Sequence, residues 1–195
     1  MRKAVVKRKT KETDIELTLT LESLEDSKIT TGIGFFDHML NSFAKHGRMK
    51  IEVKCNGDLH VDDHHTVEDI GICLGKAFNE ALGDKKGIYR FGFASVPMDE
   101  ALCQTSVDLS GRPFLIYNCP DTKGYIKDYN LEMTREFWNA FTFNANINFH
   151  VNVLYGDNTH HINEAMFKAC GIALYNAFKK DDNLNDIILS TKGKI

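Results

Sequence analysis

The chain has 195 residues, 43% hydrophobic and 26% charged, which predicts a folded protein with a sizeable core and argues against a disordered one. A net charge of −3 and an isoelectric point near 6.2 argue against nucleic-acid binding through bulk electrostatics. The sequence shows no run of about 18 apolar residues and no secretory leader, so we expect no membrane partner. Its five scattered cysteines, without a C-x-x-C pair, predict a reduced, cytoplasmic protein.

The first half of the sequence predicts strands and helices in turn. Residues 4–21 alternate apolar and polar side chains, which favours a pair of strands. Between Phe36 and Phe43 the apolar residues recur at helical spacing. The elements that follow are a strand at 49–55, a turn at 56–58, an extended piece at 59–61 and a helix from about 63 to 82.

The second half repeats this order of elements. The predicted elements are strands at 91–96, 102–109 and 114–118, a helix that begins near 133, a strand at 145–155 and a helix from about 159 to 179. The same order in both halves suggests that the chain arose by internal duplication.

A five-residue motif, His-His-x-x-Glu, occurs once in each half and supports this duplication. The copies are residues 64–68 (HHTVE) and 160–164 (HHINE), and aligning them also pairs Gly75 with Gly171. We therefore predict an α/β fold, an α+β sandwich, in one compact duplicated domain. Its half-repeats, residues 1–90 and 91–195, each form a roughly four-stranded sheet covered by helices.

The spacing of the motif is suited to binding metal ions. His64 and Glu68 lie one turn apart on the same face of a helix, whereas the neighbouring His65 projects about 100° away. His160 and Glu164 repeat this geometry in the second copy. If the two helices face each other across a pseudo-two-fold axis, two metal sites follow. One would hold His64, Glu68 and His161, and the other would hold His160, Glu164 and His65.

Two further residues complete the predicted sites. His38 and Glu136 occupy matching helix starts in the two halves, and we assign them as fourth ligands. Imidazole and carboxylate ligands with open positions suit Mn²⁺, Fe²⁺ or Zn²⁺, and the absence of thiolates argues against a closed structural zinc site. A single His-His pair is more often a surface or capping feature, and a metal pair that only ties the halves together is a second alternative.

Four polar residues outside the motif are weaker candidates. Arg90, Arg112 and Lys192 lie in loop-like or terminal segments beside small residues, where together they could hold a phosphate. Taken singly, each is more often a solvated charge. By its sequence position alone, Glu12 is a surface carboxylate.

Longer motifs resemble the imidazoleglycerol-phosphate dehydratase family over about residues 2–193. The matching segments are 31–40 (TGIGFFDHML), 63–69 (DHHTVED), 97–102 (PMDEAL), 107–113 (VDLSGRP) and the second His-His-x-x-Glu. The resemblance implies a step of histidine biosynthesis in which imidazole glycerol phosphate, a small phosphate substrate, loses water to give imidazole acetol phosphate. It also implies a duplicated α/β fold, two Mn²⁺ ions per site and a homo-oligomer of 24 subunits with sites between subunits.

The resemblance also assigns roles to individual residues. The metal positions of the family fall on the set already reached from spacing: His38, His64, His65, Glu68, Glu136, His160, His161 and Glu164. Its substrate-contacting positions fall on Glu12, Arg90, Arg112, Ser190 and Lys192. Many members have His where Glu136 stands. Because the sites of this family lie between subunits, the ligand pairing predicted above can correspond to pairing between chains.

The expected mechanism passes through a metal-bound imidazolate, because the departing hydrogen is not next to a carbonyl and is barely acidic. Glu12 is the candidate general base. The catalytic set is completed by the six motif residues, His64, His65, Glu68, His160, His161 and Glu164. Two alternatives are a metal-dependent hydrolase and a non-catalytic, metal-stapled assembly protein, but neither accounts for the long motif matches.

Overall fold

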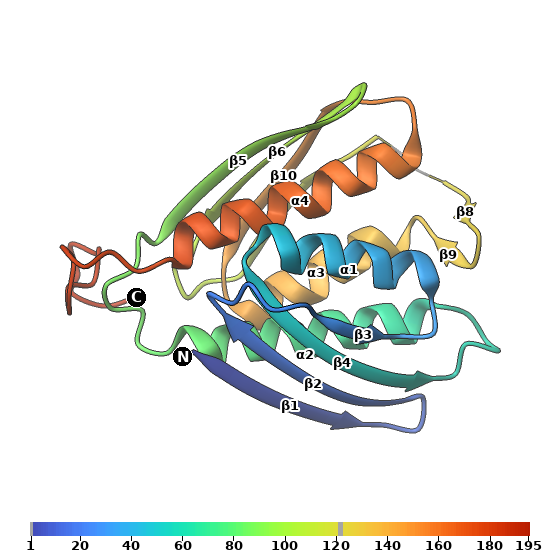
Figure 1. Cartoon of the computed structure of the whole chain (residues 1–195), viewed down its shortest axis with the longest axis horizontal. Helices are drawn as coiled ribbons and strands as arrows, with labels where there is room; N and C mark the ends of the chain where they lie inside the picture. Colours follow the sequence, from blue (N-terminus) through green and yellow to red (C-terminus); the bar gives the residue numbers. More distant parts are fainter. Residues whose placement is uncertain (1, 121–122) are drawn as a thin grey trace.

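The structure is a computed structural model that describes residues 2–120 and 123–195. It contains two four-stranded sheets with four helices between them (Figure 1). The first sheet has the strand order β1-β2-β4-β3 and the second the order β5-β6-β10-β7, so both halves share one topology. The predicted fold class is confirmed.

Each half contributes one sheet and two helices. The elements of the first half are β1 (Lys3–Lys9), β2 (Thr13–Leu21), β3 (Lys28–Thr30), α1 (Gly34–His46), β4 (Met49–Gly57) and α2 (His64–Leu82). Those of the second are β5 (Phe91–Met98), β6 (Ala101–Asp108), β7 (Phe114–Asn118), β8 (Tyr125–Ile126), β9 (Tyr129–Asn130), α3 (Met133–Ala145), β10 (Asn148–Tyr155) and α4 (Thr159–Phe178). The expected division between residues 90 and 91 lies in the connection from α2 to β5.

Alternation of side chains explains why the sheets face the helices. In β2, Ile15 and Leu17 are buried while Asp14 and Glu16 are exposed, because successive strand residues point to opposite faces. The buried face packs against α2. The extended piece expected at 59–61 is wrong: these residues form a turn, closed by a hydrogen bond from the Val61 amide to the Asp58 carbonyl of 2.8 Å.

The helices pack in pairs, α2 against α3 and α4 against α1. Each pair has one glycine, at matching positions of α2 and α4, that allows its two helices to approach closely. A side-chain carbon at Gly75 would lie 2.5 Å from the Phe141 carbonyl oxygen, and one at Gly171 would lie 2.5 Å from that of Phe43. Trp138 fills the centre, with its ring centroid 4.9 Å from that of Phe167. No helix in the described ranges is long and apolar enough to cross a membrane.

Replacing Gly75 with Ala should therefore destabilise the fold. The added methyl group overlaps backbone of α3, and such overpacking costs about 1–3 kcal/mol of unfolding free energy. Urea denaturation followed by circular dichroism measures the loss. Lys76→Ala, at an exposed position on the same helix, serves as control and should unfold at the wild-type midpoint. An unchanged midpoint for Gly75→Ala would contradict the close packing described here.

Candidate metal centre and anion site

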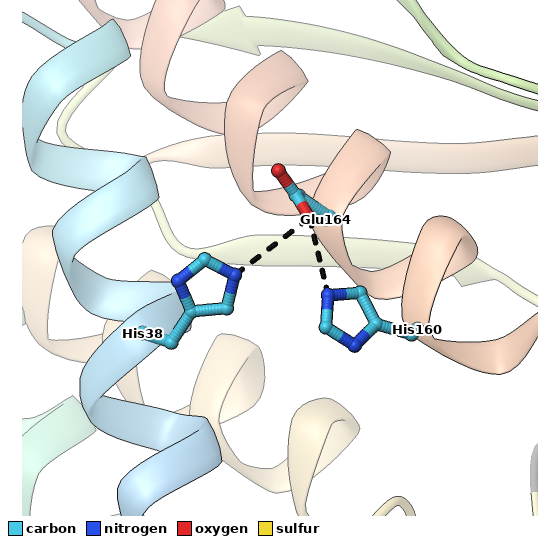
Figure 2. A group of neighbouring side chains, drawn as sticks. All are labelled: His38, His160 and Glu164. Carbon is cyan, nitrogen blue, oxygen red and sulfur yellow. Dashed lines mark hydrogen bonds and ion pairs between the residues drawn. The ribbon is translucent and has the colours of Figure 1, made fainter.

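Three metal-type side chains from α1 and α4 converge at one point. His38, His160 and Glu164 each offer one ligand atom, and these atoms all lie within 4.8 Å of one another. Figure 2 shows both imidazoles directed at the Glu164 carboxylate, whose Oε2 lies 3.2 Å from Nε2 of His160 and 3.7 Å from Nε2 of His38. Within the described ranges, this is the only group of three or more such residues in one chain.

Glu164 is held in place from its other side by a lysine. Lys168, one helical turn further along α4, contacts Oε1 of Glu164 at 2.7 Å. Burial acts to raise the pKa of Glu164, but the hydrogen bond and charge of Lys168, together with His38 and His160, outweigh it, so the pKa is lowered. The lowered pKa favours the ionised carboxylate. The sequence analysis missed Lys168, although its position four residues after Glu164 is a usable signal.

A second, looser group repeats this arrangement at the start of α2. Nε2 of His64 lies 3.8 Å from Oε2 of Glu68, and both side chains are nearly half exposed. His64 and Glu136, which lies on α3, both line a cavity of about 370 Å³. Glu136 thus stands beside the α2 motif as His38 stands beside the α4 motif, in agreement with the duplication of the fold.

The second histidine of each motif points elsewhere, so the ligand pairing expected within one chain is not formed among the described residues. Nδ1 of His65 lies 3.0 Å from Asp58, and Nδ1 of His161 lies 2.7 Å from Glu100. Neither histidine joins the opposite motif among the residues that the structure describes. The hydrogen bonds from His161 and from the Asn158 amide lower the pKa of Glu100 to about 2.

Local capping explains where the two long helices begin. The side chain of Asn158 accepts hydrogen bonds from the backbone amides of His160 and His161. Asp62 plays a similar part at α2, where its carboxylate accepts from the His64 amide at 2.9 Å. The caps leave both motif imidazoles on the first helical turn, at the end of the molecule.

The candidate anion residues form a separate group near the C-terminal segment. The Arg90 guanidinium bonds both carboxylate oxygens of Asp108, at 2.7 and 3.1 Å, and donates to the Leu189 carbonyl at 2.8 Å. Ser190 follows directly, and its hydroxyl accepts from the Lys192 amide at 3.2 Å. Arg112 follows Gly111, where an added side chain would lie 3.4 Å from Ile195. The structure therefore brings the predicted phosphate ligands to the same loop cluster.

Comparison with known proteins identifies the family of this chain. The family model for imidazoleglycerol-phosphate dehydratase matches residues 31–174. A protein of that name from Acetivibrio thermocellus is 53% identical over 100% of this chain and 99% of its own. The corresponding protein of Geobacter sulfurreducens is 50% identical over the same shares. The chain belongs to the imidazoleglycerol-phosphate dehydratase family.

Solved structures support the same assignment. The dehydratase of Staphylococcus aureus superposes with a TM-score of 0.83 at 35% identity, over 92% of this chain and 99% of that one. The Pyrococcus furiosus enzyme in complex with (S)-C348 gives 0.82 at 35% identity, over 97% and 100%. The chain is accordingly an enzyme of the hydro-lyase class, from a family of histidine biosynthesis.

In this dehydratase-family chain, the metal-type side chains at the starts of α2 and α4 lie at one end of the molecule. The anion group, which consists of Arg90, Arg112, Ser190 and Lys192, lies at the other. Helix α2 has 19 residues, and at about 1.5 Å per residue it carries the chain about 28 Å from His64 toward Arg90. Figure 1 shows the starts of α2 and α4 at one end of the long axis and the C-terminal segment at the other. Glu12, in the turn between β1 and β2, lies beside the start of α2, with its carboxylate 3.8 Å from Nε2 of His65.

The convergence of His38 on the α4 motif can be tested by metal binding. Replacing His38 with Ala removes one of three grouped ligands, so we expect the affinity for Mn²⁺ to fall by at least about tenfold. Isothermal titration of the metal-stripped protein measures the change. His60→Ala is the matched control, because His60 is exposed and lies outside the group. Equal affinities of both variants would exclude His38 as a ligand.

Proposed function

We propose that this chain removes water from imidazole glycerol phosphate to give imidazole acetol phosphate, with two Mn²⁺ ions at each active site. The family supports the substrate and the reaction. The convergence of His38, His160 and Glu164 is the observation that supports the metal dependence. The proposed ligands are His38, His64, His65, Glu68, Glu136, His160, His161 and Glu164.

The residues present fit a catalytic metal better than a structural one. The grouped donors are two imidazoles and one ionised carboxylate, a set that suits Mn²⁺, and no thiolate is among them. Three ligands leave positions open for a substrate, as catalytic sites require. Ions held there would act as Lewis acids on an imidazole ring and would fix its orientation.

Glu12 is suited to remove the proton. Its carboxylate is about half exposed, so a substrate can reach it, and it lies beside His65, one of the proposed ligands. The amide of Asp58 donates to the Glu12 carbonyl at 3.0 Å, which fixes the position of the turn. Hydroxide leaves the carbon attached to the imidazole, and the proton leaves the next carbon along the chain, so a base held beside the ring-binding position is placed to act as the general base.

Arg90, Arg112, Ser190 and Lys192 would bind the phosphate. The bonds of Arg90 to Asp108 and Leu189 fix its planar group and leave its other N–H donors for an anion. Binding energy gained at the phosphate then orients the reacting carbons some distance away.

The distances within one chain favour a site shared between subunits. The imidazole and phosphate of one substrate molecule are only about 7 Å apart. The metal-type group and the anion group are separated by the length of α2, about 28 Å. A complete site therefore combines the metal end of one copy with the anion end of another, which supports the homo-oligomer. The number of 24 subunits and the cytoplasmic location stay predictions.

The dependence on metal is tested by turnover of the metal-stripped protein. We expect no imidazole acetol phosphate from imidazole glycerol phosphate until Mn²⁺ is added, and full activity afterwards. Full turnover by the metal-free protein would contradict the metal dependence. Metal uptake with no product in any condition would contradict the reaction and revive the hydrolase and assembly-protein alternatives.

Replacing Glu12 with Gln should slow turnover by about 10²- to 10⁴-fold, because the amide cannot accept the proton. The affinity for Mn²⁺ should stay near that of the wild type, since Glu12 is not a proposed ligand. Steady-state kinetics and equilibrium dialysis measure the two effects separately. Glu16→Gln, on the exposed face of β2, is the matched control and should turn over normally. Wild-type turnover by Glu12→Gln would remove Glu12 from the mechanism.

A further inference from the structure

A carboxylate contacts the second histidine of each motif, and in both cases the contact is to the ring nitrogen Nδ1. Nδ1 of His65 lies 3.0 Å from Oδ2 and 3.2 Å from Oδ1 of Asp58. Nδ1 of His161 lies 2.7 Å from Oε2 of Glu100. A carboxylate accepts but does not donate, so Nδ1 carries the proton in both rings. When either ring is neutral, its lone pair therefore lies on Nε2.

The two carboxylates come from different places in the fold. Asp58 follows β4 and precedes α2, whereas Glu100 lies in the turn between β5 and β6. Aligning His64 with His160 would place Asp58 opposite Leu154, so the duplication does not relate the two carboxylates. The same contact to Nδ1 is thus made in both halves by unrelated residues, which indicates a shared requirement on the two histidines.

Backbone hydrogen bonds fix the Glu100 carboxylate and the main chain of Asp58. Oε1 of Glu100 accepts from the amides of Asn158, at 2.8 Å, and Asp157, at 3.3 Å, which leaves Oε2 for His161. The backbone of Asp58 is held by the Glu12 carbonyl and the Val61 amide, and its side chain is only 17% exposed. Neither contact resembles a mobile surface ion pair, which would hold the imidazole only loosely.

We propose that Asp58 and Glu100 are positioning residues of the metal centre. Each fixes the tautomer and the ring plane of its histidine, so that Nε2 is presented as the ligand atom before an ion arrives. Metal-bound histidines commonly depend on such partners, whose loss lowers metal affinity about 10- to 100-fold. This inference rests on the proposed metal-dependent function. It adds two residues from outside the His-His-x-x-Glu motifs, each of which would act through its histidine.

Equilibrium dialysis of the full-length protein against Mn²⁺ tests the inference without measuring activity. We expect Asp58→Ala to lower Mn²⁺ affinity about 10- to 100-fold. Asp58→Asn, which keeps an acceptor oxygen near Nδ1, should recover most of that affinity. Both substitutions leave the main-chain hydrogen bonds of residue 58 in place, so the turn should stay folded. A thermal melt checks this.

Glu100 is tested with a more conservative change, because its side chain also holds the start of α4. Glu100→Gln keeps only one acceptor oxygen, because its amide NH2 group replaces either the oxygen that faces the Asn158 amide or the one that faces His161. We expect a lower Mn²⁺ affinity if the contact to His161 is lost, and a lower melting temperature if the contact to the Asn158 amide is lost. Wild-type affinity together with a wild-type melting temperature would contradict the role of Glu100 in orienting the ring.

A matched control separates orientation from general electrostatics. Asp14→Ala removes one negative charge from an exposed pair with Lys9 and should leave the Mn²⁺ affinity unchanged. Equal losses in Asp14→Ala and Asp58→Ala would overturn the inference, as would wild-type affinity in Asp58→Ala. In the second case the proposed function still stands if the wild type binds two ions per active site. A wild-type protein that binds no Mn²⁺ would overturn both proposals.

Discussion

Helices α2 and α4 hold the metal-type side chains and the phosphate-binding candidates of this protein at opposite ends. Their first turns hold the His-His-x-x-Glu motifs, and their far ends lead into the loops that carry Arg90 and the C-terminal cations. A regular helix cannot shorten, so the distance of about 28 Å between the groups is set by the number of residues. The close glycine contacts with α1 and α3 keep these helices in place. Under the proposed function, a small substrate that needs both groups would bind between copies of the chain.

Duplication gave the chain two motif sites, but they are not equivalent. Glu164 is largely buried and has Lys168 on its second oxygen, whereas Glu68 is nearly half exposed. The residue that stands beside each motif also differs, His38 in one half and Glu136 in the other. Under the proposed function, the closely grouped side chains on α1 and α4 should bind a metal ion more tightly than the looser group on α2. One ion would then stay resident while the other exchanges more readily.

Local sequence signals predicted most of the fold. The repeated motif located α2 and α4, because helical spacing is a property of neighbouring residues, and alternation located the strands. The prediction of an extended piece at 59–61 was wrong, because the Asp58 carbonyl accepts a hydrogen bond that closes a turn there. Alternation of apolar and polar residues does not indicate such a bond. The ligand set for the site came from spacing and resemblance. The contacts of His65 with Asp58 and of His161 with Glu100 could not be predicted in this way. They depend on which loop packs over each helix end, and the tertiary structure decides that.

The claim that one site needs two chains is tested most directly by complementation. Glu12→Gln and Lys192→Ala, each impaired alone, are co-expressed with different tags and the mixed assembly is isolated. If Glu12 and Lys192 act from different copies, random mixing of equal amounts restores about a quarter of wild-type turnover, because that share of sites receives both intact residues. No restoration beyond the sum of the two variants would show that both residues act within one chain and would contradict the account.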